Sequence, residues 1–173
     1  MSSMRVLLLA GVLAAALVSP AQAEAAPGTV SCTGGEIDLL MHPGLTLAPG
    51  SQWLTLTGTL GRCVTPDHPA ISSGVLTAQG GLTAGCPGPI APDDLEMTVR
   101  WSDGSVSTVE GARFQGDIHQ WALMPGTITS GPFTGGRVAA LGRSTGLPDP
   151  WVLPCVIGGL SQVRTAVQAF GIG

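Results

Sequence analysis

Glycine and proline recur along the whole of this sequence, and their distribution limits the folds it can adopt. The chain has 26 glycines and 14 prolines beside 44% hydrophobic residues. Both residues destabilise the interior of a helix. Beyond residue 23, only the run 160–170 comes near a long stretch free of them with a helical apolar period. Frequent turns between short apolar segments therefore predict an all-β domain.

Several segments alternate apolar and polar residues, as strands with one buried face do. In residues 51–60 the leucines fall on one face, whereas Trp53, Thr55 and Thr57 fall on the other. Residues 95–107 form the clearest hairpin, because their alternation surrounds an Asp-Gly turn. Further strand segments are expected at 29–40, which a turn at 42–44 follows, and at 74–83, with a bulge or a bend at 80–81. Others are expected at 109–115, 118–124, 126–128, 136–141, 151–157 and 163–170.

Short strands with frequent turns are typical of β-sandwiches and small β-barrels. We expect an antiparallel sandwich, with a small β-barrel as the alternative, stapled by two disulfides. Residues 29–173 form one β-domain in this prediction, and residues 24–28 are a mobile lead-in.

The first 23 residues have the pattern of a secretory signal peptide. Arg5 supplies the positive charge, residues 6–18 form an apolar core, and Ala21-Gln22-Ala23 offers a small-x-small cleavage site. The apolar core is shorter than the roughly 20 residues that a membrane-spanning helix needs. The pattern therefore predicts a secreted, extracellular protein without a stable membrane anchor.

Four cysteines in an exported chain predict two disulfides, for which three pairings exist. We favour Cys32–Cys63 and Cys86–Cys155. A strand that starts near Cys32, turns near Gly44 and returns would bring Cys32 and Cys63 to the same end of the strand pair. The cysteines show no C-x-x-C spacing, so neither a zinc site nor a redox motif is expected.

The charge of the chain argues against nucleic acid as a partner. The formal net charge is −4, and the basic residues are scattered arginines. Such a protein repels phosphate backbones more than it attracts them. The sequence also has no phosphate-binding loop, and we expect no cofactor.

No residue is assigned a catalytic role from the sequence. The three histidines, His42, His68 and His119, each have an acid nearby in the chain, but their spacings match no known catalytic or zinc motif. A Ser-His-Asp arrangement stays open, because its members need not be neighbours in sequence.

Four acidic residues could supply the carboxylate oxygens that calcium prefers. Their spacing fits no calcium-binding loop and suits a solvated turn, so we expect no metal site. They are Asp93, Asp94, Glu96 and Asp103.

The strongest candidates for binding are two tryptophans and two threonines. Trp53 shares its strand face with Thr55 and Thr57 rather than with leucines, so an exposed ring beside hydroxyls would suit a sugar or a partner protein. Trp121 shares a face with His119 as well as with a leucine, and its side chain fits either the core or a ligand.

Cysteines, turns and aromatic residues follow one another along the chain in this order: Cys32-x-Gly34, Pro43-Gly44-Leu45, Cys63, Cys86, Trp101-x-Asp103-Gly104-x-x-Ser107, Gly126-x-x-x-x-Gly131-x-Phe133-x-Gly135 and Cys155. This order resembles that of an uncharacterised group of small secreted β-rich proteins of the actinobacterial type with two disulfides. The resemblance implies a fold and carries over no functional residues.

Three functions remain open at this point. The first is a non-enzymatic secreted domain that binds an extracellular protein or carbohydrate. The second is a small secreted hydrolase that uses a histidine and an acid, and the third is a structural component of the cell surface. We favour the first, because the sequence combines an export signal and expected disulfides with a tryptophan, Trp53, on a polar strand face. It also contains no known catalytic motif.

Overall fold

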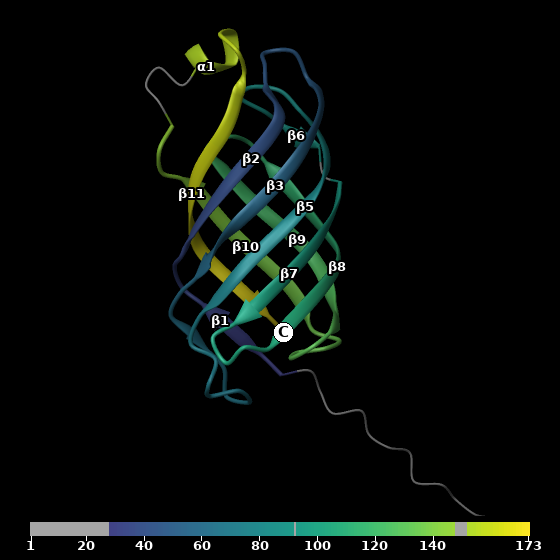
Figure 1. Ribbon diagram of the computed structural model, residues 1–173, viewed down its shortest axis with the longest axis vertical. Helices are drawn as coiled ribbons and strands as arrows, with labels where there is room; N and C mark the ends of the chain where they lie inside the picture. The colour runs from purple at the N-terminus through teal and green to yellow at the C-terminus, as the bar shows by residue number, and fades with distance from the viewer. Residues whose placement is uncertain (1–27, 92, 148–151) are drawn as a thin grey trace, which may run out of the picture.

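The computed structural model describes residues 28–91, 93–147 and 152–173 (Figure 1). The predicted signal peptide, residues 1–23, and residues 24–27 of the predicted lead-in lie outside the described residues. Among the residues described, no helix has the length and apolar character needed to span a membrane.

Eight long antiparallel strands form a closed barrel (Figure 1). Each strand pairs with the next, and β11 pairs with both β10 and β2, which closes the ring. The barrel strands are β2 (Glu36–Leu45), β3 (Gly50–Leu60), β5 (Gly74–Ala84), β7 (Asp94–Trp101), β8 (Val106–Gly116), β9 (Gln120–Ser130), β10 (Arg137–Ser144) and β11 (Leu160–Ile172).

Short elements extend the barrel at its ends. Strand β1 (Val30–Cys32) pairs with β11 and with β4 (Cys63–Val64), and β6 (Ile90–Ala91) pairs with β5 and β8. The helical turn α1 (Val152–Val156) stands at the opposite end of the barrel from β1 (Figure 1).

The all-β prediction is confirmed, but the preferred sandwich is wrong and the barrel alternative is supported. In both architectures one face of each strand is buried, so the alternation of apolar and polar residues is the same. What separates them is the pairing of β11 with both β10 and β2.

The interior of the barrel is filled by side chains. An eight-stranded barrel is just wide enough for the inward side chains to meet in the middle. Val99, Val109 and Phe114 are among the large buried groups. At the end near β1, the ring of Trp101 lies edge-on to Phe133, with 5.5 Å between the ring centroids.

Trp121 is also part of the core. Its side chain is buried, and its ring stacks on Phe114 with 5.5 Å between centroids. The ring occupies the space where a side chain of residue 142 would be, because a Cβ added to Gly142 would lie 2.2 Å from two of its ring atoms. Gly142 therefore makes room for the ring.

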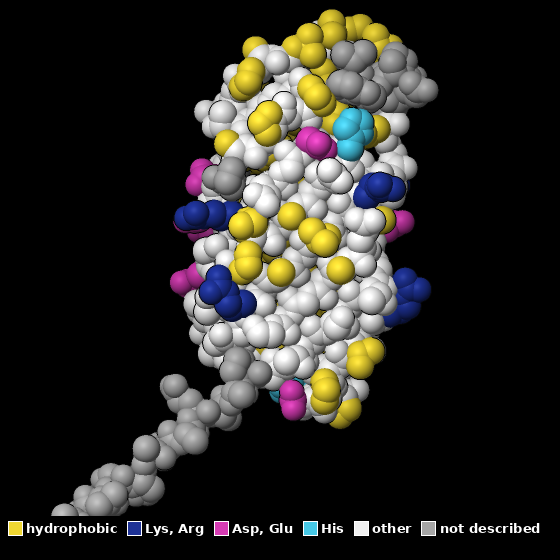
Figure 2. Space-filling model, turned by 180° about the vertical axis from the view of Figure 1, so that it is seen from behind, with side chains coloured by type: hydrophobic (Ala, Val, Ile, Leu, Met, Phe, Trp, Pro, Cys, Tyr) yellow, Lys and Arg dark blue, Asp and Glu magenta, His cyan; other side chains and the backbone are white. Residues whose placement is uncertain are grey.

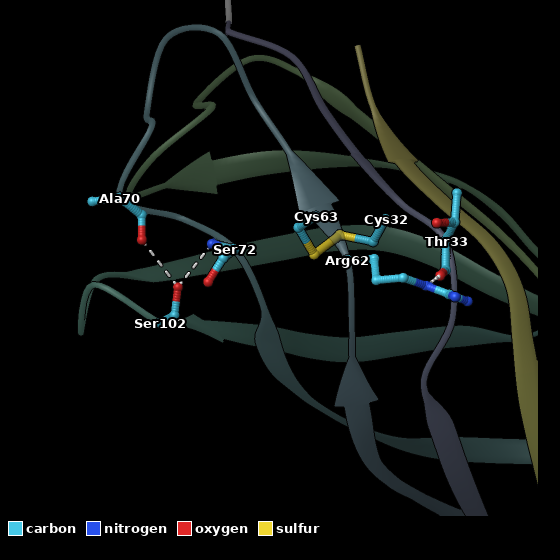
Figure 3. Close-up of a disulfide and its surroundings, with 7 residues drawn as sticks. All are labelled: Cys32, Thr33, Arg62, Cys63, Ala70, Ser72 and Ser102. Atoms are coloured by element: carbon cyan, nitrogen blue, oxygen red, sulfur yellow. Dashed lines mark hydrogen bonds between the residues drawn. A yellow bond between two sulfur atoms is a disulfide. The ribbon is translucent and has the colours of Figure 1, made fainter.

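The two predicted disulfides are present. Cys32–Cys63 joins β1 to β4, and Cys86–Cys155 ties α1 to the segment after β5. Figure 3 shows the first disulfide between two strands, with Arg62 beside it. The Nε of Arg62 donates a hydrogen bond to the carbonyl of Thr33 at 2.6 Å, which adds a second link between the same segments.

Loop residues near this disulfide are held by a serine of the β7–β8 turn (Figure 3). The Ser102 hydroxyl donates to the carbonyl of Ala70 at 3.2 Å and accepts from the backbone N–H of Ser72 at 2.9 Å. The segment between β4 and β5 is thereby fixed across the end of the barrel.

The structure differs from the predicted N-terminal half in three details. The segment 29–40 is broken at Gly35, where φ is +131° and an added Cβ would overlap the carbonyl oxygen of Thr59. The turn expected at 42–44 is absent, since β2 runs on to Leu45. No bulge occurs at 80–81: the ladder between β3 and β5 is regular, and Gly80 instead allows the backbone of Asp94 to approach closely.

The segment 151–157 is not a strand. Residues 152–156 form the helical turn α1, and residue 151 lies outside the described residues. The predicted hairpin at 95–107 is confirmed, with β7 and β8 joined through the turn that contains Asp103 and Gly104.

The Asp103 carboxylate stabilises this turn, and a pH dependence follows. It accepts hydrogen bonds from the hydroxyl of Ser105 at 2.6 Å and from its N–H at 2.9 Å, and these bonds lower the pKa of Asp103 below its usual 3.8. Because the folded pKa is lowered, the contribution is present above pH about 4 and is lost as the pH falls through the lowered pKa.

We therefore expect Asp103→Ala to be destabilising at neutral pH, with a difference from the wild type that shrinks as the pH drops below about 4. Urea unfolding between neutral and strongly acidic pH measures this difference. A difference that grows in acid would contradict the assignment. Ser105→Ala is the matched variant, because it removes the hydroxyl donor and leaves the carboxyl group in place.

Candidate functional site

Four threonines form a row across the outer wall of the barrel. Thr57 of β3 lies opposite Thr77 of β5, which lies opposite Thr98 of β7, which in turn lies opposite Thr108 of β8. Neighbouring strands are about 4.8 Å apart, so the row extends over about 14 Å. The hydroxyls of Thr77 and Thr98 are hydrogen-bonded at 2.8 Å. The four strands lie side by side in Figure 1.

A second polar row runs beside the first. Thr55 lies opposite Gln79, and Gln79 lies opposite Glu96. The Nε2 group of Gln79 donates a hydrogen bond to Oε2 of Glu96 at 3.2 Å. Hydroxyl, amide and carboxylate groups are thus arranged next to one another on three strands.

These rows line a hollow of about 910 Å³ on the outside of the barrel. We call it the threonine groove. Its outward polar side chains are those of Thr55, Thr57, Thr77, Gln79, Asp94, Glu96, Thr98, Thr108 and Glu110.

A bulge places two carboxylates at one end of the groove. The pairing of β7 with β8 shifts between Leu95 and Met97, so Glu96 faces the residue pair Glu110 and Gly111. Gly111 has a φ of +68°, a backbone conformation that favours glycine. Both glutamates are exposed and line the groove.

Ion pairs neutralise other acids nearby. The Nε of Arg113 lies 2.7 Å from a carboxylate oxygen of Asp94, and this hydrogen bond raises the pKa of Arg113. Beyond the end of the threonine row, Asp38 lies opposite Thr57 and pairs with Arg164 at 3.2 Å.

Trp53 stands next to the groove on strand β3. Its side chain is 52% exposed, and it lies on the same strand face as Thr55. Its cross-strand neighbours are His42 and Gly81, of which Gly81 has no side chain. The ring of Trp53 is therefore accessible beside the polar rows.

The four sequence-based candidates for binding have different positions. Thr55 and Thr57 line the groove, and Trp53 lies beside it. Trp121 is buried inside the barrel against Phe114, so it does not join this site.

The three histidines lie in separate places. His42 is on β2 opposite Trp53, and His68 is in the loop between β4 and β5, with its ring 4.9 Å from that of Phe133. His119 lies between β8 and β9, where its N–H donates to Asp117. Within the described ranges, no three metal-binding side chains gather at one point.

The acidic residues that could have formed a calcium site do not lie together either. Asp94 and Glu96 belong to the groove, whereas Asp103 is in the turn at the far end of β7. Oδ1 of Asp103 accepts both hydrogen bonds from Ser105.

The opposite face of the barrel has a different character. Figure 2 shows hydrophobic side chains in the middle of that face. Two hollows of about 520 and 550 Å³ lie there over β8 to β11, and both are lined by Ala122 and Leu141. The polar rows thus lie on the side of the barrel that β3, β5, β7 and β8 form.

Sequence reasoning did not identify most of the groove. Alternation placed Thr55 and Thr57 outward, but it did not reveal which residues of other strands would lie beside them. The available signal was that Thr77 and Thr98 lie at outward positions of their own expected strands, whereas Thr108 falls between the expected segments 95–107 and 109–115.

No protein-family model matches this chain, and a comparison with curated proteins finds no match either.

Proposed function

We propose that this protein is a secreted domain that binds carbohydrate in the threonine groove. The observation that carries the proposal is the row of four threonines in register, which presents hydroxyls along one line of the outer wall. Hydroxyls donate and accept hydrogen bonds, and so do the hydroxyls of a sugar.

Trp53 adds an aromatic surface beside this polar row. Its half-exposed ring has an apolar face and a polar N–H group, a combination suited to contact with a sugar ring. The row is also longer than one sugar ring, and this length favours an oligosaccharide over a single sugar.

The polarity of the groove favours carbohydrate over a partner protein. Cores of protein interfaces are depleted in charged residues and enriched in aromatic residues. The outward side chains of the groove are hydroxyl, amide and carboxylate groups. Among the described residues, no comparable group of side chains supports the hydrolase or the structural-component hypothesis.

Secretion is part of the proposal. The disulfides Cys32–Cys63 and Cys86–Cys155 suit an oxidising compartment, and the first 23 residues have the pattern of a signal peptide. Both features support an extracellular location for the groove, where it would meet extracellular glycans.

Thr98→Val tests the site, because it removes one hydroxyl from the middle of the row and keeps the size of the side chain. We expect the dissociation constant for a bound oligosaccharide to rise about fivefold, the loss of about one hydrogen bond. Titration calorimetry with oligosaccharides of cell-wall and plant polysaccharides measures it.

Thr83→Val is the matched control, since Thr83 is an exposed threonine of β5 that does not line the groove. It should bind like the wild type. Equal effects of the two variants would place the site elsewhere, and a wild-type protein that binds no oligosaccharide would refute the function. Trp53→Ala should also weaken binding, and unchanged affinity would remove Trp53 from the site.

A further inference from the structure

We propose that the threonine groove selects sugars with a protonated amine, such as glucosamine oligomers, over neutral and acidic sugars. This inference rests on the proposed function and names the chemical class of its ligand. It follows from the charges of the side chains in and around the groove.

Glu96 and Glu110 give the groove a negative end. Their hydrogen-bond partners are neutral: Gln79 donates to Glu96 at 3.2 Å, and the Thr129 hydroxyl donates to Glu110 at 3.4 Å. The ion pairs found among the described residues use Asp94 and Asp38, not these two glutamates. The charges of Glu96 and Glu110 are therefore left for a ligand.

The bulge brings these two charges to facing positions. Like charges directly across two antiparallel strands are destabilising. An ammonium group bound between Glu96 and Glu110 would relieve this repulsion and donate hydrogen bonds to both carboxylates. A carboxylate-bearing sugar at the same place would add a third negative charge.

The arginines nearest to the groove do not reverse this charge. Arg113 is bound to Asp94, and Arg100 is an exposed residue of β7 that does not line the groove. The threonine row itself is neutral. The same groove therefore combines neutral contacts along most of its length with an anionic end.

The experiment compares three oligosaccharides of equal length: glucosamine, N-acetylglucosamine and galacturonate oligomers. We expect the wild-type protein to bind the glucosamine oligomer about tenfold more tightly than the acetylated one, as two exposed ion pairs would allow. Galacturonate should bind most weakly. The preference for the amine should decrease with added salt, because both glutamates are exposed to solvent.

The variant Glu96→Gln/Glu110→Gln should reduce the tenfold ratio to near one, because it removes both negative charges that would pair with the amine. Glu36→Gln is the matched control, because Glu36 is an exposed glutamate of β2 outside the groove. It should keep the full ratio.

The outcomes separate this inference from the proposed function. If the acetylated and the amine oligomers bind equally well, and Thr98→Val weakens both, the groove binds sugars but the amine selectivity is refuted. Tighter binding of galacturonate, or a ratio that survives in the double glutamate variant, also refutes it. If none of the three oligomers binds, the proposed function fails together with the inference.

Discussion

Gly142→Ala is expected to destabilise the protein by about 3 kcal/mol, as overpacking of a filled core does. The new Cβ would lie 2.2 Å from ring atoms of Trp121, a distance that forces the ring or the strand to move. Movement of Trp121 would disturb the core, because its side chain is buried and stacked on Phe114. Urea unfolding measures the change as a lower midpoint at an unchanged slope.

Gly146→Ala is the control for this prediction, because no atom lies within 4 Å of a Cβ added there. Its effect on the midpoint should be small. Trp121→Leu supplies a second check: with the ring removed, adding Gly142→Ala should cost much less than it does alone. A full additional loss in the double variant would show that the ring is not the cause.

Removal of the Cys86–Cys155 disulfide by Cys86→Ser/Cys155→Ser should cost about 4 kcal/mol. The disulfide links residues 69 positions apart, and a crosslink restricts the unfolded chain more as the enclosed loop grows longer. The Cys32–Cys63 disulfide spans 31 positions, so its removal should cost somewhat less, by about 0.7 kcal/mol in the same treatment.

Unfolding of both double variants beside the wild type, in the absence of reductant, provides the comparison. Groove binding should persist in the Cys86→Ser/Cys155→Ser protein under conditions where it is folded, because the groove lies on β3, β5, β7 and β8. A larger loss from the Cys32–Cys63 pair would mean that local packing at β1 and β4 outweighs the loop effect.

Local pattern predicted much of the fold in this chain. The inward leucines and outward threonines of β3 were evident from alternation alone, because a strand needs only its own residues to define two faces. The β7–β8 hairpin was also local, since the turn at Asp103 joins neighbours in sequence. Closure of the barrel could not be predicted from local pattern, because it depends on the pairing of β11 with both β2 and β10.

The candidate site required information that alternation does not contain. Thr57 was assigned to an outer face, but its alignment with Thr77 and Thr98 depends on the register of two ladders. A shift of one ladder by one residue would have placed apolar side chains there instead. The facing of Glu96 and Glu110 depends on a bulge, which a pattern of period two does not predict.

The side chain of Trp121 illustrates a different limit. Its neighbours in sequence include both polar and apolar residues, so the strand pattern permitted either direction. The deciding residue is Gly142 on the adjacent strand, whose missing side chain leaves room for the indole ring. A contact between two strands thus determines that the side chain of Trp121 points into the core, which the sequence around Trp121 does not.

The pairing of β11 with β2 has a consequence for how the chain reaches its folded state. These are the first and the last of the long strands in chain order, so the final ladder joins distant segments. Until β11 is free to dock, β2 and β10 present unpaired backbone edges of the kind that recruit other chains. The chain is therefore exposed to pairing with other chains during an interval of its assembly that ends only when β11 (Leu160–Ile172) has docked against β2 and β10.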